Sequence, residues 1–408
     1  MLAVDLLTFQ FIAKTGFVPK AVCGVPFDLT MSSKTSTQIH DALFRLSLNA
    51  LQDKPNEAAV VSPFSIAMAL AAVNVGAKGS TSQEITDKAF DGIPKNQVTS
   101  WFRERLVELQ EPVSYMPESS ESPLSIASVI YLQETLEILE KYQKDLAQNF
   151  DSKVEKLDFA KNPDDSRVVI NEFVSRATKD EIPELLKPGV VGAETQIVIV
   201  NAMYLKAAFE EAFMEERTQD GDFNNEDGSV KQVPMMADAK KGRFYETDEF
   251  AYAEIKFLEY GFSFFFLVPK TGTLAELKEK LISSPDLFST TVSNSTFIPT
   301  IHMTIPKFKT DVSYNLNDAL KRLGIQELFD ERANLTGITE GPLLVSDVIH
   351  QAVFDLQEKG VTAAAATAVL MAEYGMIMSD EERHIKADRP FLYGVLNKGA
   401  PVFVGQYY

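Results

Sequence analysis

Histidine and cysteine are the side chains that most often bind metals or act in catalysis, and this chain of 408 residues uses them in no catalytic pattern. Its four histidines, His40, His302, His350 and His384, are scattered, and Cys23 is the single cysteine. The sequence contains no HExxH pair, no glycine-rich phosphate loop and no GxSxG motif. It therefore predicts a protein that is not an enzyme, with no cofactor, no metal site and no disulfide within the chain.

Residues 358–382 are unusual for another reason. Glu358-Lys-Gly360 is followed by the uncharged run 361–372, in which most side chains are small, and then by the acidic run 379–382. One interpretation is a buried helix, because Ala is the best helix former. The β-branched residues Val361, Thr362, Thr367 and Val369 weaken it. The other interpretation is a loop able to become a strand, because neither alternating face of the run would bury a charge.

Helical and strand-like hydrophobic patterns alternate irregularly along the chain, with no internal repeat. The elements that they predict would have to position residues 358–382. Apolar spacing predicts helices over 37–51, from Pro63 to about Val75, and from Pro163 onward. Long apolar runs predict strands over 123–132, 195–205, 262–268, 300–308, 343–356 and 402–407. In 343–356 both faces are largely apolar, which is typical of an interior strand. No linker separates these elements, so we predict one large α+β domain.

Composition sets limits on partners. The chain is 45% hydrophobic and 24% charged, as globular proteins are, and no stretch approaches the ~18 uncharged apolar residues of a membrane-spanning helix. Its net charge of −19 argues against nucleic acid, heparin-like polyanions and acidic membranes. Residues 1–33 are interpreted as an N-terminal extension, either disordered or a degenerate leader, because Asp5, Thr8 and Gln10 interrupt its apolar stretch.

Short motifs from about Thr35 to the last residues resemble those of the serpin family. Each motif is weak alone, but their order and spacing together are highly specific. They are Ser62–Ile66, Val200–Lys206, Val233–Met236, Ile305–Phe308, Leu323–Ile325 with Phe329, Ser346–Ala352, Glu358–Gly360 with Ala363–Thr367, and Arg389–Phe391.

The resemblance implies the serpin fold, with about nine helices and three β-sheets. Residues 34–408 would form a single serpin domain, with 358–382 as an exposed reactive-centre loop. In this metastable fold a target serine protease attacks the loop and forms an acyl-enzyme, and the cut loop then inserts into the central sheet before hydrolysis finishes. The implied loop hinge consists of Glu358, Gly360, Val361, Thr362, Ala363, Ala364, Ala365, Ala366 and Thr367.

The family's spacing from hinge to scissile bond, counted from Glu358, leads to Tyr374, cleaved before Gly375. A tyrosine suits the apolar pocket of a chymotrypsin-like protease. Met376 and Met378, the latter cleaved before Ser379, are alternatives that need a longer loop. The predicted function is irreversible suicide-substrate inhibition of a serine-type endopeptidase, chymotrypsin-like or elastase-like. The alternative is a non-inhibitory serpin acting as carrier, chaperone or storage protein.

The resemblance also implies a polar cluster of Ser62, Ser65, Asn201 and His350, beneath the sheet where strands part for the loop. The expected partner is the target protease, held in a covalent acyl-enzyme complex, and the inhibitor itself is expected to be a monomer with no heparin site. An extracellular location is expected on family grounds, with the cytoplasm as the alternative because no clear signal peptide is present.

Several positions depart from the family pattern. Ala207 and Phe209 stand where Gly and Trp are usual, and Asp180 replaces a usual Gly. At the hinge, Val361 replaces a common Thr and Thr362 a common Glu. Because both hinge residues are uncharged, we expect insertion to be permitted.

Overall fold

A computed structural model describes residues 32–110, 123–362 and 381–408. Residues Ser33–Tyr408 form one compact unit. The described ranges contain nine α-helices, of which none is long and apolar enough to cross a membrane. These helices are α2 (Ser33–Leu51), α3 (Pro63–Gly76), α4 (Gly79–Ala89), α5 (Lys95–Gln110), α6 (Glu140–Phe150), α7 (Pro163–Ala177), α8 (Leu274–Ser283), α9 (Leu287–Asn294) and α10 (Asn317–Leu323).

One sheet of seven strands carries the long interior strands. Its order is β3-β2-β4-β12-β13-β5, and β11 pairs with the other edge of β12. Every residue of β4 is buried, and β12 is buried along most of its length, as the apolar runs predict. The strands are β2 (Leu124–Gln133), β3 (Lys153–Leu157), β4 (Ile197–Leu205), β5 (Ala207–Ala208), β11 (Phe308–Asn315), β12 (Asp347–Gln357) and β13 (Gly360–Val361).

The second sheet has nine strands in the order β1-β16-β15-β9-β8-β7-β10-β14, with β6 also paired to β7. The described strands therefore form two hydrogen-bonded sheets where three were expected. The reason is that β7 pairs with each of β6, β8 and β10, which joins these strands into one sheet. The pairing of β7 with β10 contains a bulge between Ile298 and Ile301. The strands are β1 (Ala59–Val61), β6 (Gln219–Asn224), β7 (Val230–Glu246), β8 (Phe250–Lys256), β9 (Phe262–Pro269), β10 (Thr296–Pro306), β14 (Glu382–Lys386), β15 (Phe391–Asn397) and β16 (Ala400–Tyr407).

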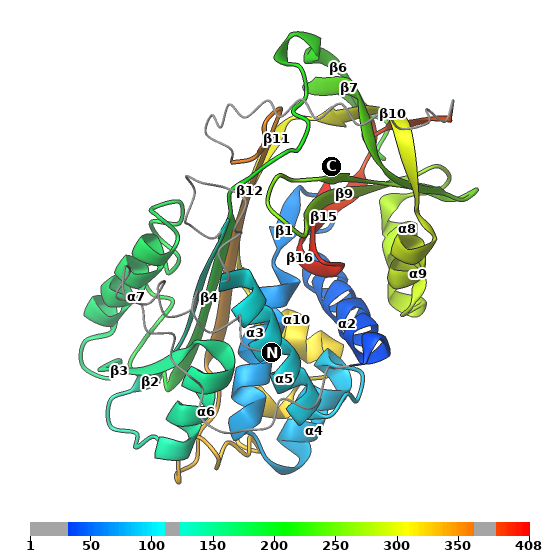
Figure 1. Ribbon diagram of the computed structural model, residues 1–408. Coiled ribbons are helices and arrows are strands. Elements are labelled where there is room, and N and C mark those ends of the chain that lie inside the picture. Colours follow the sequence, from blue (N-terminus) through cyan, green and yellow to red (C-terminus); the bar gives the residue numbers. More distant parts are fainter. Residues whose placement is uncertain (1–31, 111–122, 363–380) are drawn as a thin grey trace, which may run out of the picture. The chain divides into compact units, whose positions relative to one another are not determined.

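Helices cover both faces of the seven-stranded sheet. Figure 1 shows α7 on one side of β4 and β12, and α3 with α5 and α6 on the other. Helix α3 is apolar on all sides and almost wholly buried, because it lies between this sheet and β16. Ser62 caps it by accepting a hydrogen bond from the Ser65 N–H, and Pro63 begins it, as predicted.

Two predicted strands differ from the structure by more than one or two residues at an end. Residues 343–346 of the predicted strand 343–356 lie outside β12, which begins at Asp347. The predicted strand 300–308 is divided at Lys307, whose N–H bonds to the Pro234 carbonyl while the chain passes from β10 to β11. Alternating apolar residues indicate extended chain but do not reveal at which residue it changes sheets.

Candidate functional site

The hinge begins an additional strand in the seven-stranded sheet. Over most of their length β4 and β12 pair directly in parallel, from Asp347 opposite Val198 to Val353 opposite Tyr204. Beyond this point the chain turns back after β12, and the short strand β13 enters between β12 and β5. It runs antiparallel to both neighbours, with Val361 opposite Leu356. The first two residues of a new strand therefore already lie in the sheet.

Gly360 and Val361 fit this position for steric reasons. The Val361 side chain is fully buried. Gly360 has φ of +136°, and a Cβ atom there would lie 2.2 Å from the Ala207 carbonyl oxygen and 2.8 Å from the Ala208 Cα. No side chain can be accommodated, so the hinge requires glycine at residue 360. Thr362 has φ of +48°, and its N–H donates to the Asp355 carbonyl at 2.9 Å, which extends the pairing with β12 by one residue.

Glu358 anchors the hinge to the rest of the fold. Its carboxylate accepts hydrogen bonds from Lys307 Nζ and Thr218 Oγ1, each at 2.9 Å, and its carbonyl accepts from the Phe213 N–H at 2.8 Å. Burial alone would raise the pKa of Glu358, but the bonds from Lys307 and Thr218 outweigh it and hold the pKa below its usual value. The hinge thus starts from a fixed, ionised residue.

Aromatic side chains pack against one another beside the hinge. The Phe209 ring stacks on Phe257 with centroids 5.0 Å apart, and meets Phe213 and Phe264 edge-on. Its N–H donates to the Lys359 carbonyl at 2.8 Å. Phe209 therefore gives this site an aromatic side chain even though the family's usual tryptophan is absent.

The four predicted cluster residues lie together beneath the junction of β4 and β12. The Ser62 N–H donates to His350 Nε2 at 3.0 Å, so the ring proton is on Nδ1, which contacts Asn201 Oδ1 at 3.3 Å. Asn201 Nδ2 in turn donates to the Ser65 carbonyl at 2.8 Å. Burial lowers the pKa of His350 to about 3, so the ring is neutral at pH 7. His350 and Asn201 are register partners across the two parallel strands.

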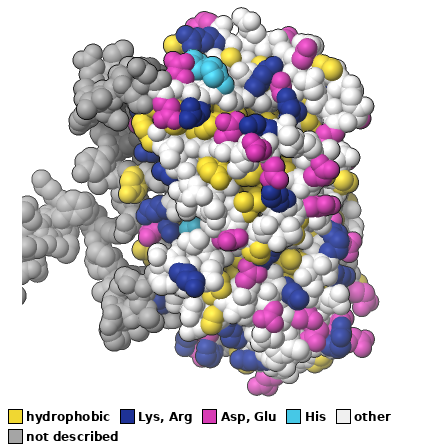
Figure 2. Space-filling view, turned by 90° about the vertical axis from the view of Figure 1, so that its right-hand side faces the viewer, with side chains coloured by type: hydrophobic (Ala, Val, Ile, Leu, Met, Phe, Trp, Pro, Cys, Tyr) yellow, Lys and Arg dark blue, Asp and Glu magenta, His cyan; other side chains and the backbone are white. Residues whose placement is uncertain are grey.

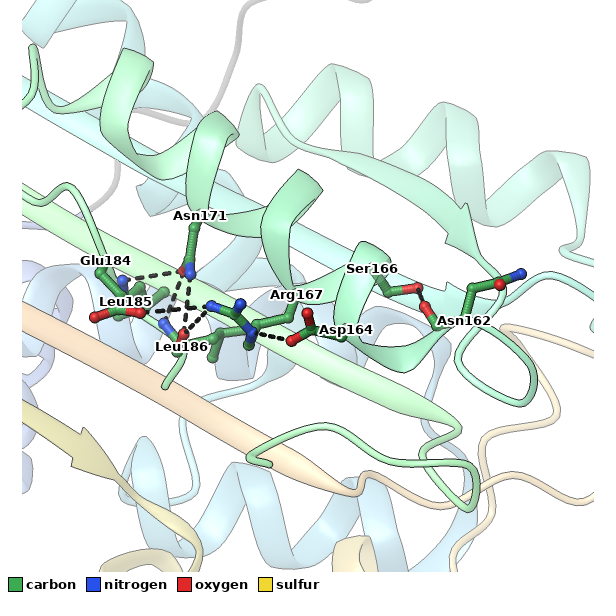
Figure 3. A network of polar contacts seen from close by, with 8 residues as sticks. All are labelled: Asn162, Asp164, Ser166, Arg167, Asn171, Glu184, Leu185 and Leu186. Atoms are coloured by element: carbon green, nitrogen blue, oxygen red, sulfur yellow. Dashed lines mark hydrogen bonds and ion pairs between the residues drawn. The ribbon is translucent and has the colours of Figure 1, made fainter. Parts of the chain in front are cut away.

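Helix α7 covers the opposite face of these strands. Asn171 Oδ1 accepts from the N–H groups of Leu185 and Leu186, and its Nδ2 donates to the Leu186 carbonyl, as Figure 3 shows. Arg167 reaches the same carbonyl at 3.3 Å. Apolar side chains of α7 and of the strands share one buried cluster, which includes Ile170, Val174, Val198, Val200, Ile349 and Val353. A strand inserted between β4 and β12 must pass beneath this helix.

Asp180 occupies a strained backbone position. Its φ is +65°, in the left-handed region that glycine tolerates best, which accounts for the family's usual glycine there. The Ser175 hydroxyl donates to its carboxylate at 2.6 Å. This bond helps to hold the conformation without glycine.

The structure places some predicted site residues and not others. Ala363, Ala364, Ala365, Ala366, Thr367, Tyr374, Gly375, Met376, Met378 and Ser379 lie outside the described residues, as do residues 1–31. Sequence reasoning missed Lys307 and Thr218, which contact Glu358 at the hinge, and Asn171, which joins α7 to the backbone of Leu185 and Leu186. Lys307 lies in the motif Ile305–Phe308, but the motif does not identify its partner. Nothing near Thr218 or Asn171 in the sequence identifies their partners, which are a distant carboxylate and backbone groups.

Comparison with known proteins identifies the family. A family model described as serpin (serine protease inhibitor) matches residues 38–408. The leukocyte elastase inhibitor of Sus scrofa is 31% identical over 369 residues, covering 88% of this chain and 94% of that protein. Ipis-1 of Ixodes persulcatus is 32% identical over 336 residues, covering 81% and 86%. Arabidopsis AtSerpin1, solved in its native stressed conformation, is 25% identical with a TM-score of 0.78, covering 93% of this chain and 98% of that one.

The chain therefore belongs to the serpin family. The predicted serpin fold is confirmed by this structural match. Serpins are protease inhibitors rather than enzymes.

Proposed function

We propose that this protein inhibits a serine protease by suicide-substrate trapping, with the segment between β13 and β14 as its reactive loop. The observation that carries the proposal is β13, which begins a strand between β12 and β5 while β4 and β12 remain paired below it. β13 thus marks the position in the sheet at which the rest of the loop could enter as a further strand. Similarity to proteins named leukocyte elastase inhibitor supports the same function.

The register of β13 can be continued along the loop. Because Val361 lies opposite Leu356, antiparallel pairing would place Ala365 opposite Ala352. Ala352 and Phe354 are fully buried, and Phe354 packs on aromatic rings of the second sheet. Odd-numbered loop residues would then face this core, where small uncharged side chains enter at the lowest steric and electrostatic cost.

Insertion would require β4 and β12 to separate. All seven residue pairs between them would break, including the pair of His350 with Asn201. We propose that the polar cluster controls this step, because the His350 contact with Ser62 can hold β12 to the start of α3 while the contact with Asn201 opens. The new strand would replace each lost backbone bond by pairing with both neighbours. Before cleavage the constraint of the intact loop keeps this state out of reach.

The protease class is proposed from the loop sequence and from the relatives. Tyr374 before Gly375 presents an aromatic ring to an apolar specificity pocket. The relatives' name, leukocyte elastase inhibitor, supports elastase-like targets beside chymotrypsin-like ones. A covalent acyl-enzyme complex, a monomeric inhibitor, the lack of a heparin site and an extracellular location stay predictions from the family resemblance.

The test is a titration of chymotrypsin and of elastase with the full chain. We expect a complex that survives denaturing electrophoresis and a released peptide that begins at Gly375, read by mass spectrometry. A peptide beginning at Ile377 or Ser379 would move the cleaved bond to Met376 or Met378. Cleavage without any stable complex, by every serine protease tried, would instead favour the non-inhibitory alternative.

A pair of variants isolates the role of the cleaved residue. Tyr374→Arg should lose inhibition of chymotrypsin and gain inhibition of trypsin, because a charged side chain is rejected by an apolar pocket and accepted by an acidic one. Tyr374→Phe is the matched control and should still inhibit chymotrypsin. An arginine variant that inhibits chymotrypsin as the wild type does would contradict the assignment of Tyr374.

A further inference from the structure

Two histidines and a glutamate meet on the outer face of the β10–β14 pair. The parallel register sets His302 directly opposite His384, and Glu382 lies two residues before His384 on the same strand and therefore on the same face. The inward-facing neighbours Ile301, Met303 and Ile385 are buried. His302 and Glu382 are exposed to 43% and 60%, and His384 is exposed as well, so the three polar side chains face solvent.

The geometry of these side chains suits a metal ion. One potential ligand atom from each lies within 4.8 Å of the other two, and His302 Nε2 is 3.5 Å from the Glu382 carboxylate. The two imidazole rings are stacked with centroids 4.6 Å apart. Ligand atoms around tetrahedral zinc lie about 3.3 Å apart, given bonds of about 2.0–2.1 Å. Small side-chain rotations, which are inexpensive for exposed residues, would bring the three atoms to that separation.

The surroundings leave this cluster accessible. The β7 residue directly opposite His302 is Ala239, which is small and exposed. Lys386, the next outward residue of β14, forms an ion pair with Asp388 at 3.1 Å. Figure 2 shows histidine side chains exposed near the upper end of the molecule, among interspersed acidic and basic side chains.

We propose that His302, Glu382 and His384 bind a divalent transition-metal ion of the zinc class, with water completing the coordination. Imidazole and carboxylate ligands are those that such an ion accepts. The proposal departs from the sequence-based expectation of no metal site. That expectation rested on the absence of a metal-binding spacing such as HExxH among the scattered histidines. Parallel strand pairing brings these three residues together from distant segments.

Such an ion would act as a clamp on β14. This strand ends the described order of its sheet and pairs with β10 alone there. It is also the first element after residues 363–380, so it anchors the far end of the proposed reactive loop. A metal bound by two β14 residues and one β10 residue cross-links the two strands. It should therefore slow the opening of β14 by stabilising the paired state.

The experiment is a calorimetric titration of the full chain with Zn²⁺, with Co²⁺ absorption as a second readout of tetrahedral coordination. We expect one ion per chain, and slower hydrogen exchange of the β14 amides when Zn²⁺ is present. His302→Ala should abolish binding. Glu382→Gln should weaken it by at least about 10-fold, the loss that removing even an outer partner causes at metal sites.

Two controls make the outcome decisive. Glu381→Gln changes the adjacent carboxylate, which pairs with Arg383, and should bind Zn²⁺ as the wild type does. Cys23→Ser removes the single thiol and should also leave binding unchanged. No heat of binding in the wild type, or binding by His302→Ala equal to that of the wild type, would overturn the proposal. Neither outcome would bear on the proposed inhibition, which is read separately from complex formation with the protease.

Discussion

Replacing Val361 by aspartate places a charge at the buried start of the inserted strand. Val361 is fully buried between Leu356 and Ala207, its register partners on either side. Before cleavage the hinge can avoid burying the charge by leaving the sheet. The intact variant then loses only the burial free energy of the original valine side chain, about 1.5–3 kcal/mol. During trapping no such escape exists, because residue 361 must occupy this position for the rest of the loop to follow.

The magnitude follows from competition between insertion and deacylation. An unpaired buried carboxylate costs several kcal/mol even after relaxation of the surroundings. If about 3 kcal/mol of that cost is felt in the transition state of insertion, the ratio of trapped to hydrolysed inhibitor falls roughly 100-fold, since each ~1.4 kcal/mol changes a rate tenfold. Val361→Asp should therefore behave as a substrate of chymotrypsin.

The assay counts the moles of inhibitor consumed for each mole of protease inactivated, with denaturing electrophoresis to separate complex from cleaved product. Val361→Thr carries the residue common in the family and should trap as the wild type does. Lys359→Gln changes the exposed neighbour of the hinge and should also trap normally. The reasoning is refuted if Val361→Asp inactivates chymotrypsin at the wild-type stoichiometry.

Three further outcomes are expected. Cleavage within residues 363–380 should raise the midpoint of thermal unfolding strongly, because the inserted strand adds paired backbone and buried apolar area; an unchanged midpoint would count against insertion. Gly360→Ala should lower the midpoint of the intact protein through overpacking of about 1–3 kcal/mol against Ala207, whereas Gly341→Ala, with no atom within 4 Å of its added Cβ, should not; equal midpoints would contradict this. Burial lowers the pKa of His350 to about 3 in the folded protein, whereas it is about 6.5 in the unfolded chain. Between about pH 6.5 and pH 3 the unfolded state therefore binds a proton that the folded state does not, and the free energy of unfolding falls by up to about 1.4 kcal/mol for each pH unit of acidification. His350→Gln should show a correspondingly shallower loss of unfolding free energy between pH 7 and 5 in urea, and a slope equal to that of the wild type would show that this histidine is not the titrating group.

Elements with one dominant local signal could be predicted from the sequence. Helix α3 has its cap at Ser62 and its proline start, and β12 has two apolar faces, so both are recognisable without any partner. The division between β10 and β11 at Lys307 could not be predicted, because it depends on which sheet each half joins.

Part of the candidate site could likewise be predicted from the sequence, and part could not. The family motifs identified Ser62, Ser65, Asn201 and His350, and the structure brings these four together. The hinge pairing of β13 and the contacts of Glu358 with Lys307 and Thr218 depend on distant segments meeting at one end of the sheet. A single sequence does not specify such contacts, because the motifs that contain Glu358 and Lys307 do not say which distant residue each one contacts.

The central claim, that the cut loop becomes a strand beside β12 in the register of β13, is tested most directly by a disulfide across that pair. In a Cys23→Ser background, Ala365→Cys combined with Ala352→Cys should form a disulfide after loop cleavage or complex formation and not before, because the two Cα atoms come within bonding range only on insertion. Ala366→Cys with Ala352→Cys is shifted by one residue, which turns the side chain to the opposite face, and should stay reduced. A cleaved protein in which the 365–352 pair stays reduced, or in which the 366–352 pair oxidises equally well, would contradict the account.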